Sequence, residues 1–172
     1  MISRGEADIK LGDSAEQVLS EGVERTAPEA GEYLSLRQAV GWPRVSLDSV
    51  REAFKQTIFF SCVRSTHQLI AFGRIVGDHS LYFYIQDVMV EPQLQRRGYG
   101  RAVVMDLLNQ AKSCAGRGAF LGLLAVSGTE SFYSRLALPS LAHENTPMGI
   151  YITKDLTRSS VVQVPNRRLR SA

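Results

Sequence analysis

Segment 87–101 combines residue types that together could bind a phosphate group. It reads Asp-Val-Met-Val-Glu-Pro-Gln-Leu-Gln-Arg-Arg-Gly-Tyr-Gly-Arg. An apolar strand pattern thus runs into a loop, and the loop opens a helical pattern with three arginines and two glycines. The first turn of a helix has N–H groups without partners and carries the positive end of the helix dipole. Glycine in that turn lets an anion approach the backbone without meeting a Cβ atom. With the charges of Arg96, Arg97 and Arg101 added, the segment predicts a pyrophosphate site.

Other phosphate- or nucleic-acid-binding motifs fit this segment less well. A Walker A loop needs Gly-Lys-Ser or Gly-Lys-Thr, and the chain contains neither. A dinucleotide fingerprint would continue Gly98-x-Gly100 to a third glycine, where the chain has Val103. RNA-binding segments rich in arginine and glycine are usually disordered, whereas this one leads into an amphipathic helix. A plain loop with solvated arginines is the remaining alternative.

The same residues resemble a known family signature. Gln95-Arg96-Arg97-Gly98-Tyr99-Gly100 is similar to the Gln/Arg-x-x-Gly-x-Gly/Ala motif of the GNAT superfamily of acyl-CoA-dependent N-acyltransferases, and the likeness covers residues about 17–154. The resemblance implies a GNAT-like α/β fold, with a mixed, mostly antiparallel central sheet of six to seven strands, about four flanking helices and two splayed parallel strands in the centre. It also implies acetyl-CoA as co-substrate, and the residues expected to bind it are Val88, Met89, Val90, Gln95, Arg96, Arg97, Gly98, Tyr99, Gly100 and Arg101.

Tyr133 is the candidate general acid. The segment Phe132-Tyr133-Ser134-Arg135-Leu136 resembles the family's later helix, in which a tyrosine often protonates the departing thiolate of coenzyme A. A phenol with an ordinary pKa near 10 keeps its proton at neutral pH and can donate it. The alternative is that Tyr133 is a core aromatic residue of a short helix.

Asp87 is the candidate general base. It lies within an apolar strand pattern, where a carboxylate is costly to bury unless it is paired or functional. It could accept the proton of a substrate ammonium, directly or through water. A structural carboxylate bonded to nearby backbone or to an arginine is an equally good interpretation, so both stay open.

Four further residues are candidates for binding the acceptor substrate. Members of the family gate their acceptor site with the first two helices, and the resemblance therefore implies a role for Tyr33, Arg37 and Trp42. Tyr84, in the expected strand 81–90, is a further candidate that could face the acceptor. Arg37 could attract an acidic group and Trp42 could form an apolar wall, although a tryptophan after a helix is often a packing anchor. The sequence does not identify the amine.

Hydrophobic spacing predicts the elements that must position these side chains. Three- and four-residue spacing indicates helices over 28–40, 47–55 with Ser46 as N-cap, 98–115 and 129–136. Apolar runs between short polar turns indicate strands over 17–23, 57–63, 69–76, 81–90, 119–126, 138–143 and 148–154. The strands within 57–90 should form an antiparallel meander, and 119–126 should lie parallel to the strand before the helix. Within helix 98–115, Asp106 is expected on the side opposite the buried stripe.

The composition excludes several classes of protein. The 172 residues are 44% hydrophobic and 22% charged, which is typical of a soluble globular domain and not of a disordered chain. No apolar run is long enough to span a membrane. The two cysteines, Cys62 and Cys114, are far apart and are expected to pack in the core. The three histidines lack the spacing of metal ligands, so no metal is expected.

The net charge of +3 is unevenly distributed along the chain. The last sixteen residues, 157–172, contain four arginines and no acidic residue, so residues 1–156 carry a charge of −1. We therefore expect one acetyltransferase domain over 1–156 and a basic, flexible tail over 157–172. A nearly neutral body argues against a nucleic-acid-binding fold. The expected partner is a small-molecule amine, with no nucleic acid and no membrane, in the cytoplasm; a homodimer is left open.

Together these features predict an N-acetyltransferase that moves an acetyl group from acetyl-CoA to a primary amine of a small molecule or peptide by direct attack. A non-catalytic acyl-CoA sensor is the main alternative, because it would use the same phosphate site without Tyr133 or Asp87. A nucleic-acid-binding protein that acts through its arginine tail is the least favoured hypothesis.

Overall fold

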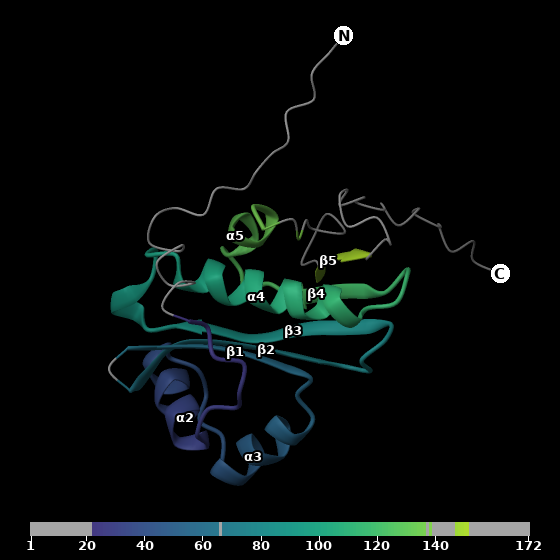
Figure 1. Ribbon diagram of the computed structural model, residues 1–172. Coiled ribbons are helices and arrows are strands. Elements are labelled where there is room, and N and C mark those ends of the chain that lie inside the picture. Colours follow the sequence, from purple (N-terminus) through teal and green to yellow (C-terminus); the bar gives the residue numbers. More distant parts are fainter. Residues whose placement is uncertain (1–21, 66, 137, 139–146, 152–172) are drawn as a thin grey trace, which may run out of the picture.

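A mixed sheet forms the centre of the molecule in the computed structural model, which describes residues 22–65, 67–136, 138 and 147–151. The five strands follow one another in space as they do in sequence (Figure 1). They are β1 (Phe59–Ser65), β2 (Gln68–Gly77), β3 (Tyr82–Val90), β4 (Phe120–Leu124) and β5 (Pro147–Tyr151). The pairs β1–β2, β2–β3 and β4–β5 are antiparallel, and β3–β4 is parallel. The predicted meander and the predicted parallel pair are both confirmed.

Helices cover both faces of this sheet. They are α2 (Ala30–Ala39), α3 (Leu47–Lys55), the 3₁₀ helix η1 (Pro92–Leu94), α4 (Tyr99–Cys114) and α5 (Glu130–Ser134). Figure 1 shows α2 and α3 on one face and α4 on the other. The predicted cap of α3 is present, because the Ser46 side chain accepts a hydrogen bond from the backbone N–H of Ser49. No helix within the described ranges is long and apolar enough to cross a membrane.

The expected number of six to seven strands is not reached among the described residues, which contain five. The predicted strand 148–154 corresponds to β5, which is described over Pro147–Tyr151; residues 152–154 lie outside the described residues. The predicted strands 17–23 and 138–143 lie largely outside the described residues. Between β1 and the N-terminal segment there is one isolated bridge, in which Glu24 pairs with Cys62.

Two hydrophobic clusters hold the layers together. One packs α4 against the sheet, and the predicted stripe of that helix, which includes Leu107 and Ala111, is fully buried. The other packs α2 and α3 against the opposite face around Phe72 and Met89. Each face of the sheet therefore has its own core.

The expectation that Asp106 would lie on the exposed side of α4 is wrong. Its side chain is only 5% exposed. The carboxylate accepts hydrogen bonds from Arg25, at 3.0 Å from Nε and 2.7 Å from Nη2, and from Gln110 at 2.8 Å. Burial of the charge is tolerated because these donors satisfy it. The expected burial of the cysteines is confirmed for Cys62 but wrong for Cys114, which is exposed.

A β-bulge interrupts the pairing of β2 with β3. Phe72 faces Met89 and Arg74 faces Gln86, so that Gly73 alone opposes the two residues Asp87 and Val88. Asp87 has a positive φ of 55°. An added Cβ at Gly73 would lie 2.7 Å from Cγ1 of Val103 on α4, so only glycine allows this close approach of helix and strand.

The bulge reverses which side chains of β3 face which helix layer, as an extra residue in a strand must. Before it, Phe83 and Ile85 pack in the α4 cluster. After it, Val88 and Val90 pack against that cluster, while Met89 belongs to the α2 and α3 cluster.

The two parallel strands diverge after a short contact. Their register contains three pairs, which join Tyr82 to Phe120, Phe83 to Leu121 and Tyr84 to Gly122. Beyond these pairs β3 continues to Val90 without a partner in β4. This is the splayed arrangement that the resemblance implied.

Candidate active site

The first turn of α4 leaves its backbone N–H groups available. Gly98 is the N-cap residue, and its φ of 96° is in the left-handed region that favours glycine. No side chain among the described residues caps this helix end. Within the described part of the chain, no hydrogen bond from the backbone N–H groups of residues 96–101 is found. Such a turn fits an anion without further change.

A cavity of about 720 Å³ opens at this helix end, between the turn, the diverging part of β3 and α5. It is lined by seven of the ten residues predicted to bind acetyl-CoA, namely Val88, Val90, Gln95, Arg96, Gly98, Gly100 and Arg101. The Gln95 side chain also donates a hydrogen bond to the backbone oxygen of Val90 at 3.2 Å, which ties the turn to the end of β3. Met89, Arg97 and Tyr99 do not line the cavity. Sequence reasoning missed Gly128, Thr129, Ser131 and Arg135, which do.

Arg101 has buried polar atoms that no described residue satisfies. Its Nε and Nη2 are inaccessible to solvent and have no hydrogen-bond partner, although the residue borders the cavity. A buried unpaired donor on a cation is costly, so native proteins rarely keep one without a reason. The free helix turn and this guanidinium together fit a pyrophosphate group, and the size of the cavity suits a ligand as large as acetyl-CoA.

Tyr133 lines this cavity and also a second cavity of about 250 Å³. Its ring packs edge-on against Phe132, with 4.9 Å between the ring centres. Burial raises the pKa of the Tyr133 phenol to about 12. The hydroxyl therefore keeps its proton at every physiological pH and is available as a donor.

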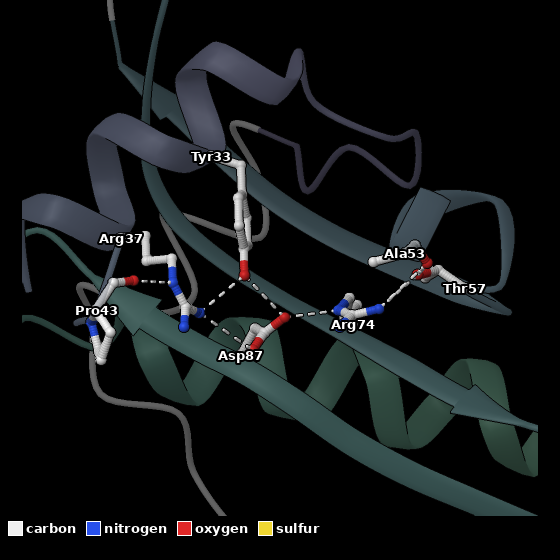
Figure 2. A network of polar contacts seen from close by, with 7 residues as sticks. All are labelled: Tyr33, Arg37, Pro43, Ala53, Thr57, Arg74 and Asp87. Carbon is white, nitrogen blue, oxygen red and sulfur yellow. Dashed lines mark hydrogen bonds and ion pairs between the residues drawn. The ribbon is translucent and has the colours of Figure 1, made fainter. Parts of the chain in front are cut away.

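Asp87 stands at the centre of a polar network rather than facing solvent (Figure 2). Its Oδ2 accepts hydrogen bonds from Arg74 Nε at 2.6 Å and from the Tyr33 hydroxyl at 3.1 Å. Arg37 Nη1 lies 3.9 Å from Oδ1. Burial, and next the Asp87 charge, raise the pKa of Tyr33, so this phenol stays protonated and donates.

These contacts favour the second interpretation of Asp87, a structural carboxylate that is bonded to an arginine. The side chain is 13% exposed and is held from both sides, by α2 through Tyr33 and by β2 through Arg74. Arg74 in turn donates to the Ala53 carbonyl at 3.3 Å and to the Thr57 hydroxyl at 3.0 Å. Sequence reasoning missed Arg74, although a lone charge within the apolar run 69–76 was the same signal that singled out Asp87.

The second cavity contains the predicted acceptor residues Arg37 and Trp42, together with Asp87, Val88 and Tyr133. We call it the acceptor cavity. The Arg37 guanidinium lies 5.1 Å from the centre of the Trp42 ring, a cation–π arrangement. Tyr33 is buried and reaches this region through its hydroxyl, which hydrogen-bonds to Asp87. Tyr84 is half-buried and lines neither this cavity nor the larger one.

A comparison with protein-family models shows to which family the chain belongs. The model of the acetyltransferase (GNAT) family matches residues 27–136, which include both cavities. The chain belongs to this family, and the predicted resemblance is confirmed.

Known relatives and solved structures agree with this family. An uncharacterized N-acetyltransferase, ycf52, of Pyropia yezoensis is 28% identical over 61% of this chain, and the match spans 62% of that relative's length. A probable acetyltransferase from meticillin-resistant Staphylococcus aureus gives a TM-score of 0.63 at 21% identity, covering 66% of this chain and 86% of that one. A GNAT family acetyltransferase from Brucella melitensis, solved in complex with acetyl-CoA, gives 0.58 at 17% identity, covering 78% and 89%. At these identities the structural likeness shows the shared fold.

Proposed function

We propose that this protein is an N-acetyltransferase that transfers an acetyl group from acetyl-CoA to a primary amine of a small molecule in a ternary complex. The observation that carries the proposal is the position of Tyr133, which lines both the cavity at the α4 turn and the acceptor cavity. Two substrates bound in these cavities would meet beside its hydroxyl. The Brucella melitensis relative, which binds acetyl-CoA, supports the choice of donor.

The donor would lie in the larger cavity. The N–H groups of residues 98–101 and the Arg101 guanidinium would hold its pyrophosphate, and the unpaired part of β3 near Val88 and Val90 would hold its pantetheine arm. Acetyl-CoA supplies an activated acetyl group as a thioester. Backbone N–H groups at Val88–Val90 would stabilise the oxyanion, a contribution of roughly 3 to 4 kcal/mol per donor in other enzymes.

Proton transfer would use Tyr133 and water. The Tyr133 hydroxyl would protonate the departing sulfur, since burial keeps this group in its neutral form. Burial also makes the phenolate costly, so the phenol must recover a proton as it gives one up. The acceptor ammonium would lose its proton to water near Asp87, because the Asp87 carboxylate is already occupied by Arg74 and Tyr33.

The test is a thiol-release assay with acetyl-CoA and a panel of amines, run on the wild type and on Tyr133→Phe. We expect turnover to fall at least tenfold in the variant while the dissociation constant for acetyl-CoA, measured by calorimetry, stays nearly the same. Tyr82→Phe is the matched control, because this tyrosine is 63% exposed and lines neither cavity. Binding of acetyl-CoA without thiol release by any amine would favour the non-catalytic sensor instead.

A further inference from the structure

Arg37 occupies a central position on the acceptor side of the sheet. It lines the acceptor cavity and two neighbouring cavities, of about 250 and 230 Å³, beneath α2 and α3. Its side chain is 17% exposed, so it faces these hollows rather than bulk solvent. Arg37 is therefore shared by the acceptor cavity and both of its neighbours.

The surrounding residues fix the guanidinium in one orientation. Nε donates to the Pro43 carbonyl at 2.9 Å, and Nη1 donates to the Tyr33 hydroxyl at 3.1 Å. The Trp42 ring packs against its face. Nη2 has no partner among the described residues, and Figure 2 shows it pointing away from Tyr33. Nη2 is therefore positioned in advance and available to donate to a carboxylate.

The charges around this edge leave a positive excess. Arg37 and Arg74 share the single carboxylate of Asp87. Tyr33 is neutral, because burial raises its pKa. No second carboxylate lines the acceptor cavity or the adjoining cavity at Ser49, within the residues that the structure describes. A net charge of about +1 attracts an anionic group and repels a polycation.

We infer that the acceptor is a small amine that also carries a carboxylate, as an amino acid does, and that Arg37 binds this carboxylate and determines specificity. The inference rests on the proposed function. The acceptor cavity, at about 250 Å³, lies just below the roughly 300 Å³ at which typical ligand pockets begin, which fits a molecule of this size. With its carboxylate at Arg37, the amine would lie in the same cavity that Tyr133 lines.

The experiment compares free amino acids with their α-carboxamides in the thiol-release assay. The amide differs from the acid mainly by the loss of the negative charge. Its α-amine also loses a proton more readily, so more of it is in the reactive, unprotonated form. A preference for the acid therefore cannot come from amine reactivity. A hydrogen bond between charged groups corresponds to roughly ten- to hundredfold in binding. We expect kcat/KM for the acids to exceed that for the amides at least tenfold, and spermidine to be a poor acceptor.

Arg37→Met should reduce this ratio to about one. Arg37→Lys keeps the charge but loses the planar fork, and should give an intermediate ratio. Arg51→Met is the matched control, because Arg51 is 63% exposed on α3 and lines none of these cavities. Unchanged acetyl-CoA affinity in each variant shows that it is folded; if Arg37→Met does not fold, the ratio in Arg37→Lys decides.

The outcomes separate this inference from the proposed function. Thiol release with equal activity on acids and amides, or a preference that survives in Arg37→Met, would overturn the role of Arg37 and leave the acetyltransferase standing. Acetyl-CoA binding without thiol release by any amine in the panel would overturn both. A preference that extends to peptides with an acidic first residue, but not to free amino acids, would overturn the small-molecule acceptor.

Discussion

Replacing Arg101 by methionine should change stability and ligand binding in opposite directions. Two buried nitrogen atoms of Arg101, Nε and Nη2, have no hydrogen-bond partner among the described residues. A buried unpaired donor costs about 1–3 kcal/mol, and methionine keeps much of the apolar stem without these donors. We therefore expect Arg101→Met to raise the free energy of unfolding of the ligand-free protein by about 1–2 kcal/mol.

The same change should weaken acetyl-CoA binding. If the guanidinium binds the pyrophosphate, its loss removes charge-assisted hydrogen bonds, and affinity should fall roughly tenfold or more. Urea unfolding of the ligand-free protein measures the first effect. Calorimetry with acetyl-CoA, and the rise in melting temperature that the ligand causes, measure the second. Arg117→Met is the control, because Arg117 is exposed beyond the far end of α4 and lines none of the cavities described above.

Either of two results would refute this reasoning. A loss of stability in ligand-free Arg101→Met would mean that the guanidinium already has a stabilising partner. An unchanged affinity for acetyl-CoA would mean that the buried nitrogen atoms do not face the ligand. A rise in stability together with a loss of affinity is the pattern expected of a binding residue that is strained until its ligand arrives.

Two further outcomes are expected. Asp87→Asn should lower the free energy of unfolding by about 2–3 kcal/mol, because Arg74 and Arg37 lose the charge of a carboxylate that is only 13% exposed. Adding Arg74→Met to this variant should recover part of the lost stability, because it removes one of the two unpaired cations. Strictly additive losses in urea unfolding would argue against the pairing, and a loss of turnover beyond a hundredfold in folded Asp87→Asn would favour the general base. Because burial raises the pKa of Tyr133 from about 10 to about 12, its protonated form contributes stability that is complete below pH 10 and is lost as the pH rises through 12. Tyr133→Phe should flatten that alkaline loss, and an unchanged pH profile would contradict the assignment.

Local patterns in the sequence were sufficient for most of the fold. Helix 47–55 was predicted with its cap because Ser46 and the apolar spacing act within a few residues of each other. The turn before α4 was predicted for the same reason, since glycines and arginines adjoin a helix start. These features depend on neighbours along the chain, which the sequence displays directly.

The errors and omissions concern residues whose partners are distant in sequence. Asp106 was misplaced because its partner Arg25 lies 81 positions away. The contacts of Asp87 depend on Tyr33, 54 positions away, and on a bulge that no glycine or proline within β3 announces. The signal for that bulge is Gly73 on the neighbouring strand, whose requirement becomes clear only when α4 is seen packing against it.

The extra residue in β3 changes which positions of the strand face α4. Upstream of it, odd-numbered positions face α4; downstream, even-numbered positions do. Deleting Asp87 would therefore restore continuous pairing, with Gly73 opposite Val88, and would leave Val88 and Val90 facing α4 and Met89 facing the aromatic rings under α2. The packing of β3 against both helix layers does not need the inserted position, which instead supplies the carboxylate that Arg74 and Tyr33 contact.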